Sequence, residues 1–225
     1  ISCSLVGSEM CIRDRFIHCK KGDFTMQLTI REPGSAITHF IGCLMALIAA
    51  SPLLIKAHGN ATYMLAMTIF ATSMVLLYAA STIYHSICHV STKVLRNFQK
   101  LDHMMIFVLI AGSYTPVCMI ILGGRIGYTL LALVWGIAVA GIIVKGLWIT
   151  CPKWFSSIIY IAMGWTCLPV FARLWTDLPH AAFGWLLAGG IIYTIGGVIY
   201  ALKLPVFNAP VSYTHLRAHE TAANL

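Results

Sequence analysis

Residues able to do chemistry gather at the ends of long apolar segments in this sequence. Ser81 and His85 lie before a short polar connection, and Asp102 and His103 follow it. The four-residue spacing of Ser81 and His85 would place both side chains on one face of a helix. A hydroxyl, an imidazole and a carboxylate that meet in a low-dielectric cavity can position a metal ion or activate water. The motifs therefore predict such a site, or alternatively a hydrogen-bonded cluster that closes a helix end.

Two further ionisable residues, Glu32 and His39, precede these motifs. Glu32-Pro33 is typical of a helix start, because proline suits the first turn and a carboxylate there complements the helix dipole. His39 follows two turns later on nearly the same face. Ionisable groups at membrane depth are expensive and usually face the bundle interior. We therefore expect both residues near the site, the alternatives being a dipole-stabilising carboxylate and a hydrogen-bonded core histidine.

The segments that must position these residues are strongly apolar. Hydrophobic residues make up 59% of the chain and charged residues only 10%, whereas about 45–50% apolar is usual for a soluble domain. Stretches of about 20 apolar residues predict transmembrane helices, and their uninterrupted character excludes a β-barrel. The predicted fold is an all-α polytopic membrane bundle, in one domain, with spans near 36–55, 62–87, 102–123, 126–148, 155–173 and 181–202.

The net charge of +8 is distributed unevenly between the two sides of these spans. Nine basic residues flank the spans on one side, and three lie on the other, at Lys56, Arg125 and Arg173; the nine are Lys20, Lys21, Arg31, Lys93, Arg96, Lys100, Lys145, Lys153 and Lys203. The positive-inside rule then predicts a cytoplasmic N-terminus and a site at the cytoplasmic face. The excess of basic residues is explained by membrane topology, so nucleic acid is not an expected partner.

The two ends of the chain depart from the pattern between them. Residues 1–15 and 211–220 resemble translated sequencing-adapter DNA, and we set them aside from the fold. We expect residues 1–25 to be a non-native or disordered leader and residues 26–208 to be the transmembrane domain. Residues 209–225 are expected to be a non-native tail.

Five motifs in a fixed order carry a family resemblance over about residues 26–208. They are Glu32-Pro33-x-x-x-x-Thr38-His39-x-x-Gly42, Ser81-x-x-x-His85, Leu101-Asp102-His103, Gly112-Ser113-Tyr114-Thr115-Pro116 and the stretch Ala188–Thr194. Each motif alone is weak, but together they resemble the haemolysin III family, the bacterial branch of the progestin and adipoQ receptor superfamily. The resemblance implies a seven-helix bundle in the bacterial inner membrane with a cytoplasmic N-terminus. Six of those helices are visible here.

The same resemblance implies a zinc ion bound by three histidines. His85 matches one of them, Asp102 matches an aspartate that holds a zinc-bound water, and Ser81 matches a further site residue. The other two ligands belong to an H-x-x-x-H motif in the seventh helix, expected at about positions 209 and 213, where this sequence has Ala209 and Tyr213. His215-x-x-x-His219 has the right internal spacing but lies about six residues late, inside the suspected foreign tail. We therefore expect an incomplete zinc site.

Two classes of function follow. The first is a zinc-dependent membrane hydrolase that acts on a lipid amide or ester, with His85 as ligand, Asp102 as base or water-orienting residue, and Ser81 polarising substrate or water. The second is non-enzymatic, either a cytolysin that forms pores or a membrane-homeostasis protein. Polar residues near one membrane face, rather than in a stripe along several helices, favour a site. Membrane lipid is the expected partner, and no oligomeric state is predicted.

Overall fold

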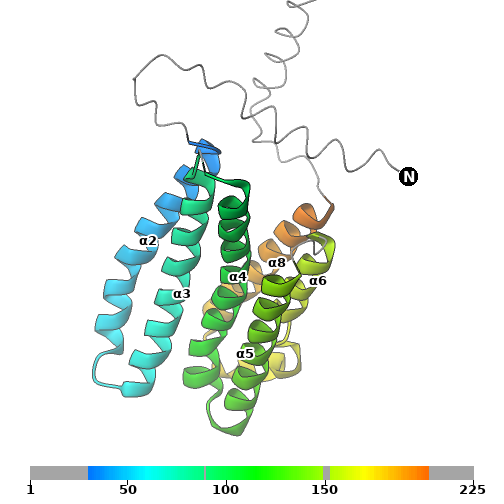
Figure 1. Ribbon diagram of the computed structural model, residues 1–225. Helices are drawn as coiled ribbons and strands as arrows, with labels where there is room; N and C mark the ends of the chain where they lie inside the picture. Colours follow the sequence, from blue (N-terminus) through cyan, green and yellow to red (C-terminus); the bar gives the residue numbers. More distant parts are fainter. Residues whose placement is uncertain (1–29, 89, 149–152, 203–225) are drawn as a thin grey trace, which may run out of the picture.

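The computed structural model describes residues 30–88, 90–148 and 153–202, and all regular structure within these ranges is helical (Figure 1). Six of its helical units are long and apolar enough to cross a membrane. This confirms the predicted all-helical polytopic fold. The helices are α2 (Pro33–Ala57), α3 (Ala61–Ser86), α4 (Thr92–Pro116), α5 (Gly124–Leu147), α6 (Lys153–Gly164), α7 (Phe171–Asp177) and α8 (His180–Leu202). The expected leader (1–25) and tail (209–225) lie outside the described residues, so these two boundaries stay predictions.

Helix starts follow local sequence signals. The side-chain oxygen of Asn60 accepts hydrogen bonds from the backbone N–H groups of Thr62 and Tyr63, at 3.0 and 3.1 Å, and so caps α3. The hydroxyl of Ser91 accepts from the N–H of Val94 at 3.4 Å and caps α4. Such caps satisfy amide donors that the first helical turn leaves without partners. They fix the residues at which α3 and α4 begin, and these two helices carry the predicted site residues Ser81, His85, Asp102 and His103.

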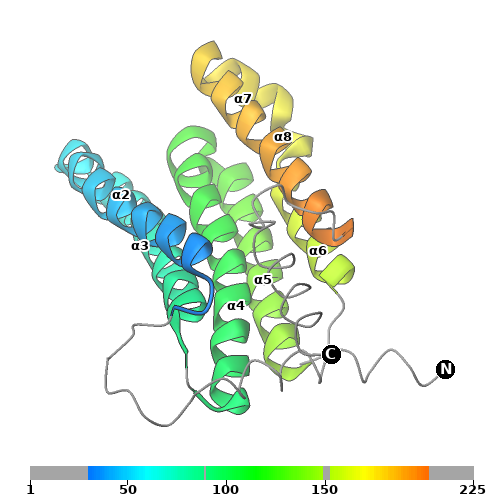
Figure 2. The same cartoon turned by 90° about the horizontal axis from the view of Figure 1, so that it is seen from above.

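Helix α4 lies at the centre of the bundle. Figure 2 shows α2 and α3 on one side of α4 and α5, and α6 to α8 on the other. Contacts run from α2 to α3, α3 to α4 and α4 to α5, while α6 packs against α8 and also touches α4. Side chains of α4 and the elements around it form the main core, including Phe107, Ala111, Cys118, Val134, Ala138, Met163 and Leu174. Motifs near the start of α4 are therefore held by neighbours on both sides.

The third span changes helix type at its proline. Helix α4 ends at Pro116, and a π-helical segment, Val117–Leu122, continues the same span. Proline removes one backbone hydrogen bond, and nearby hydroxyls can bond the exposed carbonyls. The carbonyl that Pro116 leaves without its usual donor is that of Gly112. One residue before it, the carbonyl oxygen of Ala111 accepts from the Thr115 hydroxyl at 2.9 Å, and this hydroxyl accepts from Trp135 Nε1 at 3.2 Å.

The fifth span is interrupted, although the sequence predicted one continuous segment over 155–173. Helix α6 ends at Gly164, and a 3₁₀ turn (Leu168–Val170) leads into the short α7. Pro169 has no N–H to continue the α-helical ladder. The Tyr114 hydroxyl bridges the gap, since it donates to the carbonyl of Gly164 and accepts from the N–H of Cys167. Irregular backbone at membrane depth needs such protein partners because lipid offers none.

Candidate functional site

The start of α2 is joined to the end of α3 through Glu32 and His85. Glu32 Oε2 lies 2.7 Å from His85 Nδ1, and the Glu32 backbone N–H donates to the His85 carbonyl oxygen at 3.1 Å. Glu32 occupies the residue before α2, but its side chain makes no capping hydrogen bond to that helix. Its carboxylate reaches across to α3 instead.

The contact with Glu32 leaves the other ring nitrogen of His85 available. An ionised carboxylate can only accept hydrogen bonds, so the shared proton belongs to Nδ1. In the neutral imidazole, Nε2 then keeps its lone pair. Histidines that bind metals almost always donate their second N–H to a carboxylate or carbonyl in this way. The Glu32–His85 pair therefore has the form of a metal ligand with its orienting acid.

His39 completes this group from the second turn of α2. Its ring stacks on that of His85 with centroids 5.4 Å apart and planes 15° from parallel. Asp102 is close enough to contribute to the electrostatic environment of His39. Ser81 lies one turn before His85 and is only 4% exposed. The structure thus brings together Glu32, His39 and His85, while their role as a functional site stays a prediction.

Asp102 and His103 lie at the start of the neighbouring α4. Asp102 Oδ2 is 3.8 Å from His103 Nδ1, and both side chains are largely buried. His103 Nδ1 also lies 2.7 Å from the carbonyl of Gln99 in its own helix, and its backbone carbonyl accepts from the Tyr160 hydroxyl at 2.9 Å. These contacts tie His103 to α4 and α6. Direct approach of His85 to Asp102 stays a prediction.

Sequence reasoning missed two members of this group, Arg31 and Tyr84. The Arg31 guanidinium carbon lies 4.1 Å from the centroid of the Tyr84 ring, and Nη2 is 3.3 Å from Glu32 Oε1. Each of the two is the chain neighbour of a residue that the motifs had singled out. The sequence pattern marks Arg31 only as a topology charge, and its adjacency to Glu32 is the signal that points to the site.

The family resemblance implies a zinc ion, which needs nitrogen, sulfur or oxygen donors in a tetrahedral array. His85, oriented by Glu32, fits one ligand position. No group of three or more His, Cys, Asp or Glu side chains is placed to hold a metal ion within residues 30–88, 90–148 and 153–202. A tetrahedral zinc site needs further protein ligands. The positions considered for them, 209 and 213 or His215 and His219, lie outside the described ranges, so the described residues do not form a zinc site by themselves.

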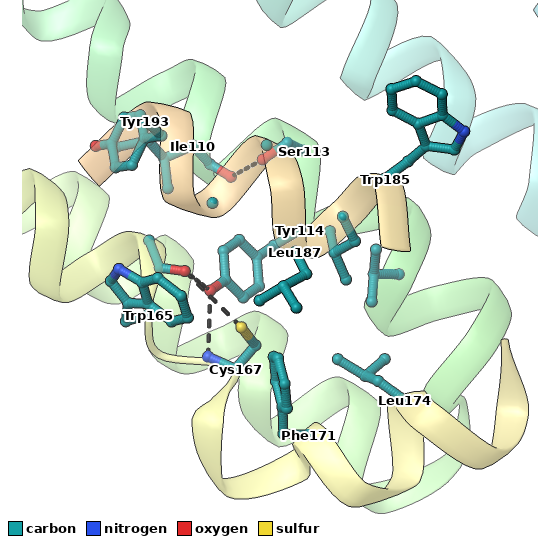
Figure 3. A pocket seen from close by; sticks show the side chains of 15 residues that line it. Ile110, Ser113, Tyr114, Trp165, Cys167, Phe171, Leu174, Trp185, Leu187 and Tyr193 are labelled. Carbon is teal, nitrogen blue, oxygen red and sulfur yellow. Dashed lines mark hydrogen bonds between the residues drawn. The ribbon is translucent and has the colours of Figure 1, made fainter. Parts of the chain in front are cut away.

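A separate apolar cavity of about 360 Å³ lies between α4, the interrupted fifth span and α8 (Figure 3). Its polar atoms come from a few side chains, and the hydroxyl of Tyr114 points to the interruption. The residues that line it include Ser113, Tyr114, Trp165, Cys167, Gly190 and Tyr193. The cavity depends on the break in the fifth span, and its signals in the sequence are Pro169 and the glycine pair 189–190.

Comparison with known proteins places these features in a family. The chain matches the model of the family described as "Haemolysin-III related" over residues 27–221. That range extends past residue 208 and includes His215 and His219. The chain is 41% identical to "Hemolysin-3" of Bacillus cereus over 184 residues, which cover 81% of this chain and 83% of the relative.

Two further relatives widen the comparison. The "Hemolysin-3 homolog" of Bacillus subtilis (strain 168) is 40% identical over 178 residues, covering 78% of this chain and 83% of that protein. "Progestin and adipoQ receptor-like protein 1" of Caenorhabditis elegans is 29% identical over 212 residues, 84% of this chain and 46% of the relative. The six apolar helices and these matches agree with one another. The chain therefore belongs to the haemolysin III family of the progestin and adipoQ receptor superfamily and is a multi-pass membrane protein.

Proposed function

We propose that the group around Glu32, His39, His85 and Asp102 is a hydrolase-like site for a lipid amide or ester. The observation that carries this proposal is the 2.7 Å contact between Glu32 and His85. An ion pair in contact with solvent contributes little to folding stability, so stability alone is a weak explanation for this contact. A carboxylate that fixes one ring nitrogen of a histidine, next to a second histidine and a buried serine, is typical of sites that activate water.

Each residue has a definite part in this proposal. Glu32 holds the His85 ring so that Nε2 faces away from the carboxylate. Asp102 orients the attacking water or accepts its proton, and Ser81 polarises the substrate carbonyl or the water. His85 Nε2 is the atom that would hold zinc, together with ligands from beyond the described residues. Bound zinc supplies a Lewis acid and lowers the pKa of its water to about 7.

The apolar cavity supports a lipid as substrate. Asp102 and Ser113 are eleven residues apart on α4, so at about 3.6 residues per turn they face within about 20° of one another. The cavity lined by Ser113 thus opens on nearly the same side of α4 as Asp102, about 16 Å deeper along the axis. A headgroup near Asp102 would leave its hydrocarbon chain directed along α4 towards this cavity.

The distribution of basic residues supports a cytoplasmic location for the site. Lys93, Arg96 and Lys100 all lie at the end of the bundle that holds Glu32 and His85. Lys100 Nζ donates to the carbonyl of Gly146, so the last turn of α5 lies at that end as well. The positive-inside rule then orients this end towards the cytoplasm of a bacterial inner membrane.

The test is fatty-acid release by purified protein in lipid nanodiscs with zinc added in excess, supplied with a ceramide-type amide or a lipid ester and followed by mass spectrometry. We expect His85→Ala and Asp102→Asn to lower the rate by about 10²- to 10⁴-fold, the usual range for loss of general acid–base catalysis. His58→Ala is the matched control, because His58 follows α2 at its opposite end. Equal release by wild type and Asp102→Asn would refute the hydrolase proposal.

The names of the relatives favour a second candidate, a cytolysin. Two bacterial relatives are called haemolysins, and lysis requires no hydrolytic residue if the protein forms pores. Dye leakage from liposomes and haemoglobin release from erythrocytes would test it. Leakage that is equal for wild type and Asp102→Asn, without fatty-acid release, would favour the pore. Leakage lost together with hydrolysis would favour lipid cleavage as its cause.

A further inference from the structure

The guanidinium of Arg31 is buried with donors left over. Its side chain is 14% exposed, and it lies against the ring of Tyr84. Nε and Nη2 are both buried and have no hydrogen-bond partner among the residues that the structure places. Buried polar groups are hydrogen-bonded in nearly all folded proteins, and a charged donor without a partner is costly. This pair of donors therefore needs an explanation.

The two donors form one recognition edge. Nε–H and the outer N–H of Nη2 point the same way in the plane of the guanidinium, which is the fork that binds two oxygens of one carboxylate or phosphate. Glu32 does not fill this fork. Its Oε1 lies 3.3 Å from Nη2 without making a hydrogen bond, and its Oε2 is held by His85 Nδ1 at 2.7 Å.

The location of Arg31 indicates which oxyanion would meet the fork. Arg31 comes two residues before Pro33, where the first membrane-capable helix begins. The ends of such helices lie at the level of the lipid headgroups. Tyr84 belongs to the last turn of α3, and aromatic side chains of this kind are common at the same level. Phosphate groups of lipids are the abundant oxyanions at that depth.

We propose that Arg31 binds the phosphate of an anionic lipid headgroup through Nε and Nη2, beside the Glu32–His85 pair. Tyr84 holds the guanidinium plane, and the interaction of Glu32 with His85 limits the repulsion between the carboxylate and the bound phosphate. The inference rests on the proposed function only where it identifies the bound lipid as substrate, because the binding itself needs no hydrolysis. It adds a headgroup preference to the site.

The test measures lipid binding to the full chain in detergent, by native mass spectrometry with phosphatidylglycerol or phosphatidylcholine as probe. We expect phosphatidylglycerol to bind at least tenfold more tightly than phosphatidylcholine. Arg31→Lys keeps the charge but removes the fork, so it should lose about tenfold in affinity for phosphatidylglycerol. Arg96→Lys is the matched control, since Arg96 is an exposed arginine at the same end of the bundle, and it should bind like wild type.

Several outcomes would overturn the inference. They are equal binding of the two lipids, wild-type affinity in Arg31→Lys, or equal losses in Arg31→Lys and Arg96→Lys. A separate competition experiment adds inorganic phosphate to the protein with phosphatidylglycerol. If it competes with phosphatidylglycerol at equal concentration, the site takes small anions rather than lipid headgroups and the inference fails.

Folding and catalysis are separated by two further measurements. Arg31→Lys and wild type should have the same thermal unfolding midpoint, and Arg31→Gln should show the same loss of binding as Arg31→Lys or a larger one. Asp102→Asn should keep the preference for phosphatidylglycerol while losing hydrolysis. Arg31-dependent binding in a protein that hydrolyses nothing would uphold the lipid site and refute the hydrolase. Hydrolysis without a headgroup preference would uphold the hydrolase and refute the lipid site.

Discussion

The carboxylate of Glu32 and the imidazole of His85 are 53 residues apart in the chain, yet their nearest atoms are 2.7 Å apart. The backbones of the two residues are also hydrogen-bonded, since the N–H of Glu32 donates to the carbonyl of His85. Glu32 therefore orients a ring in another helix rather than capping its own. The two helix ends are thus joined by both side chain and backbone, and this relationship can be tested directly.

Glu32→Gln should weaken the contribution of His85 to lipid hydrolysis. Glutamine keeps one acceptor oxygen but loses the charge that fixes the proton on Nδ1. Loss of such an orienting carboxylate typically costs 10- to 100-fold in metal affinity or activity. We expect a fall of that size in lipid hydrolysis. The matched control is Asp177→Asn, a carboxylate paired with Arg173 away from the site, and a drop of equal size in the control would show that the effect is not local.

Zinc content should report on residues beyond the described ranges. Because His85, Asp102 and a water are too few for a tight tetrahedral site, we expect well under one equivalent of zinc in the purified 225-residue chain. Metal analysis of wild type, His85→Ala and the double variant His215→Ala/His219→Ala would check this. A full equivalent that both variants lose would contradict the expectation. It would show that His215 and His219, which fall within the family match, act as ligands.

Gly190→Leu should slow turnover of long-chain lipids by filling the apolar cavity. Gly190 lines the cavity, and an added Cβ there would lie 3.7 Å from Trp165, which is an ordinary contact. The larger side chain would then fill the part of the cavity that the hydrocarbon chain of the substrate would occupy. We expect at least a tenfold loss with a long-chain amide and a much smaller loss with a short-chain one. Gly196→Leu is the control on the same helix, since nothing lies within 4 Å of its Cβ position.

Tyr114→Phe should destabilise the interrupted fifth span. The substitution removes the hydroxyl that joins the Gly164 carbonyl to the Cys167 N–H. Removing the hydroxyl partner of these two partly buried backbone groups should cost about 1–3 kcal/mol, with only the weak Cys167 thiol donor left to the Gly164 carbonyl. Unfolding in mixed micelles by denaturing detergent would measure this. Tyr128→Phe is the control at an exposed tyrosine, and equal stability of the two variants would argue against the bridging role.

The sequence predicted the fold with little help from tertiary detail. In lipid, backbone groups must be satisfied within the segment, so long apolar stretches can only be helices. This is why the spans run close to their predicted ranges, apart from the third, which begins at Thr92 rather than near residue 102. The fifth, predicted over 155–173, also matches a membrane-capable unit, Trp154–Asp177, but hydropathy averages over a window and misses the break inside it. Such an average cannot tell a continuous helix from one that stops at Gly164 and restarts after Pro169.

The sequence also determined by itself which residue types stand at the helix ends, since Ser81, His85, Asp102 and the Glu32–His39 segment follow from composition and spacing alone. Only the tertiary structure decided their partners. A contact between Glu32 and His85, or between Tyr114 and the break in the fifth span, depends on how separate helices pack. The orientation of Arg31 on Tyr84 depends on the same packing. Helix periodicity fixes the side that a residue faces within its own helix, whereas the neighbour on that side is set by the packing of the whole bundle.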